Sequence, residues 1–421
     1  MKKFILNKSE KHWVSYDIGN SAFTLLITTI MPIYFNSLAQ KDGMSAVDYL
    51  AYWGYAASVT TLIVAFLGPI LGTFSDLPKM RKKIFVGTLV VGVIGCLSLG
   101  IMPGWFMFLV VFVIAKVGYS ASLVVYDSML SDITKNDRMD IVSSYGYAYG
   151  YIGSCVPFVI SLLLVLGGSK IGISTSLAMN LAFWVTALWW VGFSLPLIKN
   201  YQQIYFVKPK AHPVKDSFVR LGHTFRDIAK NKHVFVFLLA FFFYIDGVYT
   251  IIAMSVAYGQ ALGLSSTGLL LALLVTQIVA FPSALLLGRL THKFQASRIL
   301  GITILAYLGI AIFAVQLNHQ WEFWFLAVMV GLFQGTIQAL SRSYYAKIIP
   351  PEKSGEYFGI YDICGKGASF LGTALMGFVG QMTGNISLGV VVIVVMFVIG
   401  FIFFRKATQL NEVYESNERQ V

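Results

Sequence analysis

The stretch AFFFYIDGVYT, residues 240–250, places a single carboxylate inside an apolar block of sequence. The nearest charged residues on either side of Asp246 are Lys232 and Arg289. The whole chain has this character: 57% of its 421 residues are hydrophobic and 12% are charged, whereas a soluble domain has about 25% charged residues. The composition therefore predicts a membrane protein, in which a carboxylate at this position needs a function or a partner.

Apolar blocks recur along the chain. A helix needs about 20 residues to cross ~30 Å of hydrocarbon. Blocks of that length lie at roughly 14–38, 51–74, 84–102, 105–130, 142–166, 175–198, 234–258, 267–290, 297–317, 321–346, 357–381 and 386–404. They do not alternate apolar and polar residues, as the strands of a β-barrel do. We therefore predict an all-α membrane protein with twelve transmembrane helices.

The basic residues are distributed unevenly between the predicted loops. If the amino terminus is cytoplasmic, 26 of the 31 Lys and Arg residues fall in cytoplasmic segments, and Lys41 and Lys170 are the two in outside loops. This is the positive-inside bias, and it predicts that both termini of a multi-pass cell-membrane protein are cytoplasmic. The bias also explains the net charge of +12 without nucleic acid as a partner.

The longest polar interval, residues 199–233, divides the predicted spans six and six. It separates an N-terminal half (1–198) from a C-terminal half (234–421). The halves resemble each other weakly: GPILGTFSDLPKMRKK, which contains Gly72, corresponds to ALLLGRLTHKFQASR, which contains Gly288. Two six-helix halves around a midplane site are a transporter architecture.

Three charged residues lie deep in predicted helices. Asp246 is 12 residues into its span, about 18 Å deep, where it would act as a proton carrier or as the partner of a buried cation. Lys116 is similarly deep and requires a wet cavity or a carboxylate. Lys366 lies four residues after Asp362, which suits either a local ion pair or a substrate contact.

Polar side chains also form helical stripes. Gln334, Gln338 and Arg342 repeat every four residues on one face. Two amides and a planar guanidinium suit recognition of a carboxylate or hydroxyl group, although interhelical hydrogen bonding would require the same residues. Asp17 begins a second stripe. We expect it to be a substrate or coupling residue, and the alternative is an anion that favours the positive end of a helix dipole.

The segment GTFSDLPKMRKK, residues 72–83, combines a glycine, an acid and a basic cluster between two predicted spans. We expect Gly72, Asp76 and Arg81 to form a gating latch, the alternative being a solvated charged surface. The histidines show no metal-ligand spacing, and no nucleophile elbow occurs. We therefore expect no cofactor, no metal and no enzymatic activity.

The chain resembles the major facilitator superfamily, and within it the branch of the autophagy-related vacuolar amino-acid effluxer and its bacterial relatives. The segments that carry the resemblance are YDIGNSAF (16–23), YGYAYGYIGS (145–154), YIDGVYTI (244–251), QALSRSYYAKIIP (338–350) and FGIYDICGK (358–366). It implies that the first, fourth, seventh and tenth spans line a central cavity. The latch departs from the superfamily pattern at Leu77 and Lys79, and His292 replaces the acid in the second half.

These features predict a secondary transporter that works by alternating access. The expected substrate is a small polar or zwitterionic, amino-acid-like solute, with protons as the candidate coupling ion and a monomer in the lipid bilayer as the working unit. An exporter of amphipathic compounds is the alternative, suggested by the aromatic residues between Phe241 and Tyr249. A channel or scramblase is a further alternative.

Overall fold

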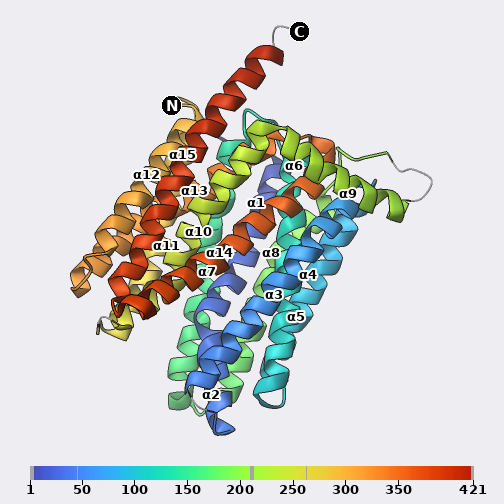
Figure 1. Ribbon diagram of the computed structural model, residues 1–421. Helices are drawn as coiled ribbons and strands as arrows, with labels where there is room; N and C mark the ends of the chain where they lie inside the picture. Colours follow the sequence, from blue (N-terminus) through green and yellow to red (C-terminus); the bar gives the residue numbers. More distant parts are fainter. Residues whose placement is uncertain (1–3, 45, 209–212, 262, 419–421) are drawn as a thin grey trace.

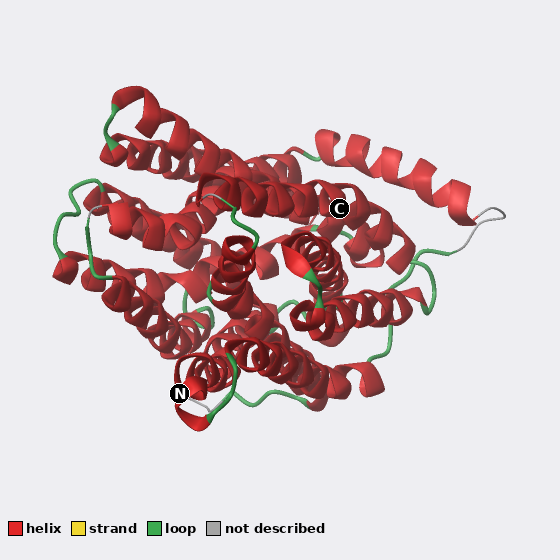
Figure 2. Ribbon diagram, turned by 90° about the horizontal axis from the view of Figure 1, so that it is seen from below, coloured by secondary structure: helices red, strands yellow, loops and turns green. Residues whose placement is uncertain are grey.

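The computed structural model describes residues 4–44, 46–208, 213–261 and 263–418, and the regular structure in these ranges is helical (Figure 2). A first group of helices comprises α1 (Lys8–Thr28), α2 (Ile30–Lys41), α3 (Ala46–Ser75), α4 (Met80–Ser98), α5 (Gly104–Ser128), α6 (Leu130–Ile133), α7 (Met139–Gly167) and α8 (Thr175–Asn200). A second group comprises α10 (Lys232–Ala261), α11 (Ser266–Leu290), α12 (Ala296–Ala314), α13 (Gln320–Ile348), α14 (Ser354–Thr383) and α15 (Ile386–Glu418). Between them lies α9 (Pro213–Lys230).

The helices have the length and surface of membrane spans. In the described part of the chain, eleven spans are long and apolar enough to cross a bilayer, and α14 covers the remaining predicted one. Large apolar side chains are exposed on the outside of the bundle, for example Phe66 (73%) and Leu163 (68%). Such surfaces are stable against lipid and unfavourable in water. The prediction of an all-α membrane protein is confirmed.

The first and the last helices extend furthest beyond the predicted spans. The first begins at Lys8, before residue 14, because Asn7 and Glu10 form a capping box in which each side chain accepts from the other's backbone N–H. The last continues to Glu418, beyond residue 404. Hydropathy reports the part of a helix that lies in hydrocarbon, whereas caps and polar turns decide where the helix ends.

Both termini lie at the same end of the bundle, together with α9 (Figure 1). We call this the basic end, because it also holds the α3–α4 loop with its lysines. The two helix groups follow the predicted six-and-six arrangement in chain order, and the division of the chain at 199–233 stays a prediction.

The two groups meet most extensively along α3 with α14 and along α7 with α11, and they also meet along α7 with α13 and α5 with α14. The α3–α14 pair is close at the basic end, where a Cβ on Gly72 would lie 2.1 Å from the Gly355 carbonyl oxygen and one on Gly359 would lie 2.6 Å from Pro69 Cα. Glycine permits this backbone contact because it has no side chain.

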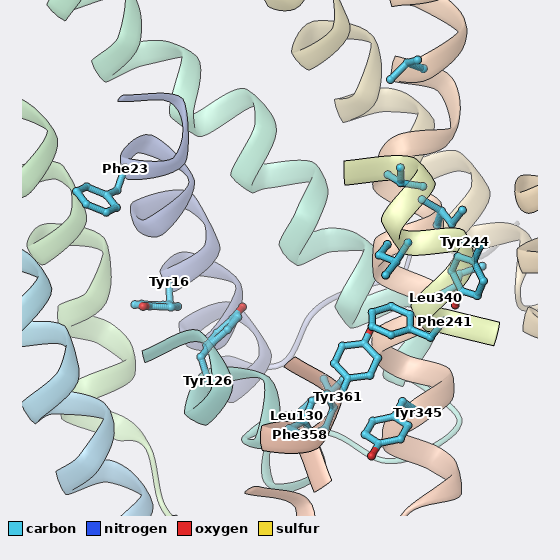
Figure 3. Close-up of a cluster of buried hydrophobic side chains, with 14 of the residues drawn as sticks. Tyr16, Phe23, Tyr126, Leu130, Phe241, Tyr244, Leu340, Tyr345, Phe358 and Tyr361 are labelled. Atoms are coloured by element: carbon cyan, nitrogen blue, oxygen red, sulfur yellow. The ribbon is translucent and has the colours of Figure 1, made fainter. Parts of the chain in front are cut away.

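Aromatic residues pack each group internally (Figure 3). In the first group, Tyr16 and Tyr126 join α1 to α5, with ring centroids 4.6 Å apart. In the second, Phe241 stacks on Tyr361 at 4.0 Å and joins α10 to α14. Each group is therefore packed around its own aromatic cluster.

Candidate functional site

A central cavity lies between the two groups, with about 1360 Å³ of space including the part open to solvent. Helices α1, α5, α7, α10, α11, α13 and α14 supply its walls. Its charged and amide lining residues are Asp17, Asn20, Asp127, Gln277, Gln334, Gln338, Arg342 and Asp362. The predicted stripe on 334, 338 and 342 therefore faces a cavity, together with Asp17.

The cavity opens away from the basic end. Along the cavity face of α1, Asp17 and Asn20 are buried, Ser21 is half-buried, and Thr24 and Thr28 are exposed. Exposure thus rises with distance from the basic end, where the two groups are in contact. The structure shows a state closed at the basic end and accessible from the opposite end.

Arg342 of α13 forms the floor of the cavity. Its guanidinium donates to Asp127 Oδ1 of α5 at 2.9 Å and to Asp17 Oδ2 of α1 at 3.3 Å. It also donates to the hydroxyl and the carbonyl oxygen of Ser143 on α7, at 2.9 and 3.1 Å. One side chain of the second group therefore holds three helices of the first group.

Two aromatic rings complete the environment of this guanidinium. Its carbon lies 4.4 Å from the ring centroid of Tyr147 and 4.6 Å from that of Trp13. Arg342 is only 2% exposed. Removing one partner of such a buried, hydrogen-bonded charge is strongly destabilising, so the closed floor depends on both carboxylates and the arginine.

Asp246 is on a helix that lines the central cavity, but its side chain does not face that cavity. It is fully buried in α10, and its Oδ1 accepts from the Gly372 N–H and the Thr250 hydroxyl, both at 3.2 Å. It does not line the central cavity. Among the described residues, no ion pair or hydrogen bond joins Asp246 to a cation.

The two predicted lysines also have separate environments. Lys116 is half-buried on α5 and does not line the central cavity. Its ammonium group lies 5.6 Å from the ring centroid of Phe112. The backbone of Lys366 belongs to α14, and its side chain lies outside the described residues. The proposed roles of both lysines stay predictions.

The predicted latch residues meet at the basic end. Arg81 donates to Asp76 Oδ1 and to Asp132 Oδ2, each at 2.6 Å, and the side chains of all three are buried. Asp132 also accepts from the Tyr201 hydroxyl and from the backbone N–H of Ile204, at 3.0 Å for the latter. The segment that leaves α8 is thereby tied to the latch.

Asp76 reaches across to the other helix group. Its two oxygens accept from the backbone N–H groups of Gly355 and Glu356, each at 2.9 Å. These are the second and third residues of α14, whose first turn carries the positive end of the helix dipole. The carboxylate therefore caps a helix of the opposite group, and Gly72 permits the approach.

The same burial makes Asp76 sensitive to protonation. Burial raises the pKa of Asp76 to about 6, against the lowering effects of the Arg81 charge and the two backbone N–H groups. The nearby Glu356 carboxylate raises the pKa further. The latch thus contains a carboxyl group that titrates close to neutral pH.

The α7–α11 pair is built differently. A Cβ on Gly288 of α11 would lie 2.3 Å from Ser144 Cβ of α7, a side-chain atom. The acid at this crossing, Asp140, belongs to α7 itself and accepts from Ser343 at 2.7 Å and Lys347 at 2.5 Å, both on α13. No carboxylate of the second group caps α7 in the described residues.

His292 occupies the position where the latch acid of the first half has its counterpart. Its ring lies 5.8 Å from that of Phe4, near the amino terminus. The neighbouring Arg289 donates to the Tyr145 hydroxyl at 2.6 Å. Among the described residues of this loop, His292 and Arg289 thus contact aromatic side chains and form no acid-centred latch.

Sequence reasoning did not select several residues of the floor and the latch. Asp127, Trp13 and Tyr147 surround Arg342, and Asp132 shares Arg81 with Asp76. Asp127 could have been selected from the sequence, because it is an acid on a helix predicted to line the cavity, four residues after Leu123. The aromatic partners carry no such signal, because aromatic residues are common in every span.

Comparisons with known proteins agree with this geometry. A family model described as vacuole effluxer Atg22-like matches residues 7–411. An uncharacterized MFS-type transporter, YxiO of Bacillus subtilis, is 42% identical and covers 96% of this chain and 95% of its own. Autophagy-related protein 22 of Saccharomyces cerevisiae is 22% identical and covers 89% of this chain and 87% of its own.

Solved structures share the fold at low identity. The MFS transporter FucP in its outward conformation aligns with a TM-score of 0.70 at 14% identity, over 95% of this chain and 97% of its own. A bacterial homologue of the iron transporter ferroportin, in an outward-facing state, aligns with a TM-score of 0.71 at 12% identity, over 96% and 98%. These matches establish the predicted major facilitator fold.

Proposed function

Since the chain belongs to the Atg22-like family and is an MFS-type transporter, we propose that it moves a small zwitterionic, amino-acid-like solute by alternating access. The observation that supports this proposal is the mixed charge of the cavity floor, where Arg342 faces Asp17 and Asp127. A zwitterion presents one group to each sign of charge.

The floor offers specific partners to such a solute. Arg342 provides a planar donor fork for a carboxylate, with Gln338 one turn away on the same helix face. Asp17 and Asp127 together carry one more negative charge than Arg342 neutralises. An ammonium group that binds there compensates this charge and competes with Arg342 for the two carboxylates.

Alternating access then follows from the contacts at the floor. In the present state, the Arg342 ion pairs and the Asp76 contact with α14 close the basic end. A substrate that engages Arg342, Asp17 and Asp127 replaces contacts between the groups with contacts to itself. The basic end is then free to open, and the opposite end closes around the bound solute.

The proposal also includes the orientation of the chain in the membrane and the coupling of transport to protons. We place the basic end in the cytoplasm of a cell membrane, by the positive-inside bias, with a single chain as the transport unit. Coupling protons would bind at one of two places: the excess carboxylate of the cavity floor, or Asp246 in α10. Both are shielded carboxyl groups at membrane depth, where a proton relay is expected.

The test is flux in proteoliposomes across a panel of amino acids, with and without an imposed pH gradient. Arg342→Lys keeps the charge but loses the fork, and we expect exchange to fall ~10–100-fold, the loss of one charge-assisted hydrogen bond. Arg289→Lys is the matched control, because Arg289 contacts Tyr145 and does not line the cavity. If folded wild-type protein moves no amino acid, the zwitterion proposal fails.

Two aspartate variants separate the coupling sites. Asp127→Asn should abolish accumulation driven by a pH gradient and preserve measurable exchange if the floor carries the proton. Asp246→Asn should do so if α10 carries it. Accumulation that survives both substitutions, in protein of verified fold, would exclude Asp127 and Asp246 as the coupling carboxyl groups.

A second candidate function has its own observation. An apolar cavity with about 820 Å³ of space lies in the second group, lined by residues such as Tyr258, Phe323 and Ile393. It shares Gln277 and Gln334 with the central cavity. A polar site next to an apolar one suits an amphipathic compound, so organic cations with apolar tails belong in the same flux panel.

A further inference from the structure

Helix α9 lies outside the membrane spans and has no part in the proposed transport site. It runs crosswise to the spans at the basic end (Figure 1), and both views place it along the outer edge of the bundle (Figures 1 and 2). It packs against α3, α10 and α14. Its contacts with Thr73 and Phe74 place it beside the end of the apolar α3 span, which closes at Ser75.

Contacts on one face fix the rotation of α9 about its axis. Arg220 donates through Nε to Glu356 of α14 at 2.9 Å and through Nη2 to the Thr73 carbonyl oxygen of α3 at 2.5 Å. Thr224 and Ile228 are buried on the same face. Because the protein-facing side is held by these contacts, the directions of the other faces are determined.

The remaining surface of α9 divides into an apolar face and a charged face. At about 100° per residue, Phe218 and Phe225 point in nearly the same direction, roughly a quarter turn from the protein-facing side. Both are large and exposed, at 52% and 48%. Arg226 and Lys230 lie on the far side of the helix and are exposed.

The apolar face continues the lipid-facing surface of the bundle. On α3, Leu62 and Phe66 are 61% and 73% exposed, and Phe74, which is half-buried, lies eight residues after Phe66 near the end of the helix. The ring of Phe218 packs edge-on against Phe74, with centroids 6.1 Å apart. This ring contact therefore joins the apolar face of α9 to the end of α3, whose exposed apolar side chains face lipid.

We propose that α9 is an interfacial helix that binds the lipid headgroup layer at the basic end, with Phe218 and Phe225 inserted beside the acyl chains. A helix with a large apolar face, a cationic polar face and few apolar residues overall binds in this way. Arg226 and Lys230 make anionic headgroups the preferred partners, since each cation near an anionic surface adds attraction. The proposal depends on the membrane location of the chain and not on its substrate.

The test uses the full chain in lipid nanodiscs. Cys96, Cys155 and Cys364 are replaced, and a bimane fluorophore is attached at Phe225→Cys or, as matched control, at Val219→Cys. Val219 is also apolar and 51% exposed, but it points to the charged side of α9. Lipids spin-labelled near the glycerol should quench the label at position 225 at least twofold more than at 219, and aqueous iodide should show the reverse preference.

Lipid charge provides the second measurement. Lipid quenching at position 225 should increase when phosphatidylglycerol replaces part of the phosphatidylcholine, and Arg226→Gln with Lys230→Gln should remove this increase. Equal iodide quenching at both positions would overturn the proposal, because the apolar face would then be in water. Quenching by neither agent at position 225 would overturn it too, because protein would cover the face.

Discussion

The two crossings between the helix groups hold the basic end closed by different means. At α3–α14, backbone meets backbone at Gly72 and Gly355, and Asp76 of one group caps a helix of the other. At α7–α11, Gly288 meets the side chain of Ser144, and no such cap crosses between the groups in the described residues. The two related loops have thus diverged in chemistry while keeping a glycine at the contact.

This difference shows which features of a repeated segment are present in both halves of the chain and which are present in one. A glycine is kept because two helices cannot approach closely otherwise. The acid is not needed twice, because Asp140 of α7 forms an ion pair with Lys347 of α13, next to the α7–α11 crossing. The α3–α14 crossing should therefore control closure, and substitutions at the two crossings should have unequal effects.

The largest expected difference concerns the glycines. Gly72→Ala should abolish closure of the basic end, because its Cβ would lie 2.1 Å from a backbone oxygen that cannot move aside. Gly288→Ala should also disturb closure, but Ser144→Gly in the same chain should restore it, since the obstacle is a side chain. The measurement is the distance between spin labels at Lys79 and Glu352 by double electron–electron resonance. A pair Gly72→Ala/Gly355→Ala that closes normally would refute this reading.

A smaller effect is expected from the acids. Asp76→Ala removes two hydrogen bonds to a buried carboxylate and leaves Arg81 with Asp132 alone, so the closed population should fall ~10–100-fold, the effect of losing a charge-assisted bond. Asp140→Ala should lower it only a few-fold, since Lys347 is partly exposed and such pairs are worth about 0–1 kcal/mol. The same spin labels report both variants, and equal losses would remove the asymmetry.

The smallest effect is the response to pH. Burial raises the pKa of Asp76 to about 6 in the closed state, and we expect opening to hydrate the carboxyl group and lower its pKa. Closure therefore binds protons: the closed population is favoured by acid, and this advantage is lost as the pH rises through about 6. Arg81 and Glu356 are the charged groups that shift the pKa of Asp76, in opposite directions.

The control for this titration is Asp76→Asn, which should flatten the pH dependence of the spin-label distance between pH 5 and 8. A midpoint near 6 that persists in the variant would assign the titration to another group. A wild-type distance that does not change over this range would show that Asp76 keeps its charge in both states.

The contrast between predicted and observed site residues has one physical origin. The stripe of Gln334, Gln338 and Arg342 was visible in the sequence because three polar residues at a spacing of four mark one face of a helix. Asp246 stands alone in its block, so no pattern indicated its direction. It points to Gly372 of α14, where the absence of a side chain makes room for the carboxylate.

The sequence by itself determined that this chain is an all-α membrane protein of long apolar helices. Hydrocarbon permits few ways of satisfying backbone hydrogen bonds, so a long apolar block in the sequence indicates a membrane-spanning helix. Only the tertiary structure decided which charged groups meet. One residue changes the direction of a side chain by about 100° on a helix, and the rotation of each helix is set by packing against its neighbours. That packing paired Arg342 with Asp17 and Asp127, joined Asp76 to the start of α14, and turned Asp246 away from the cavity.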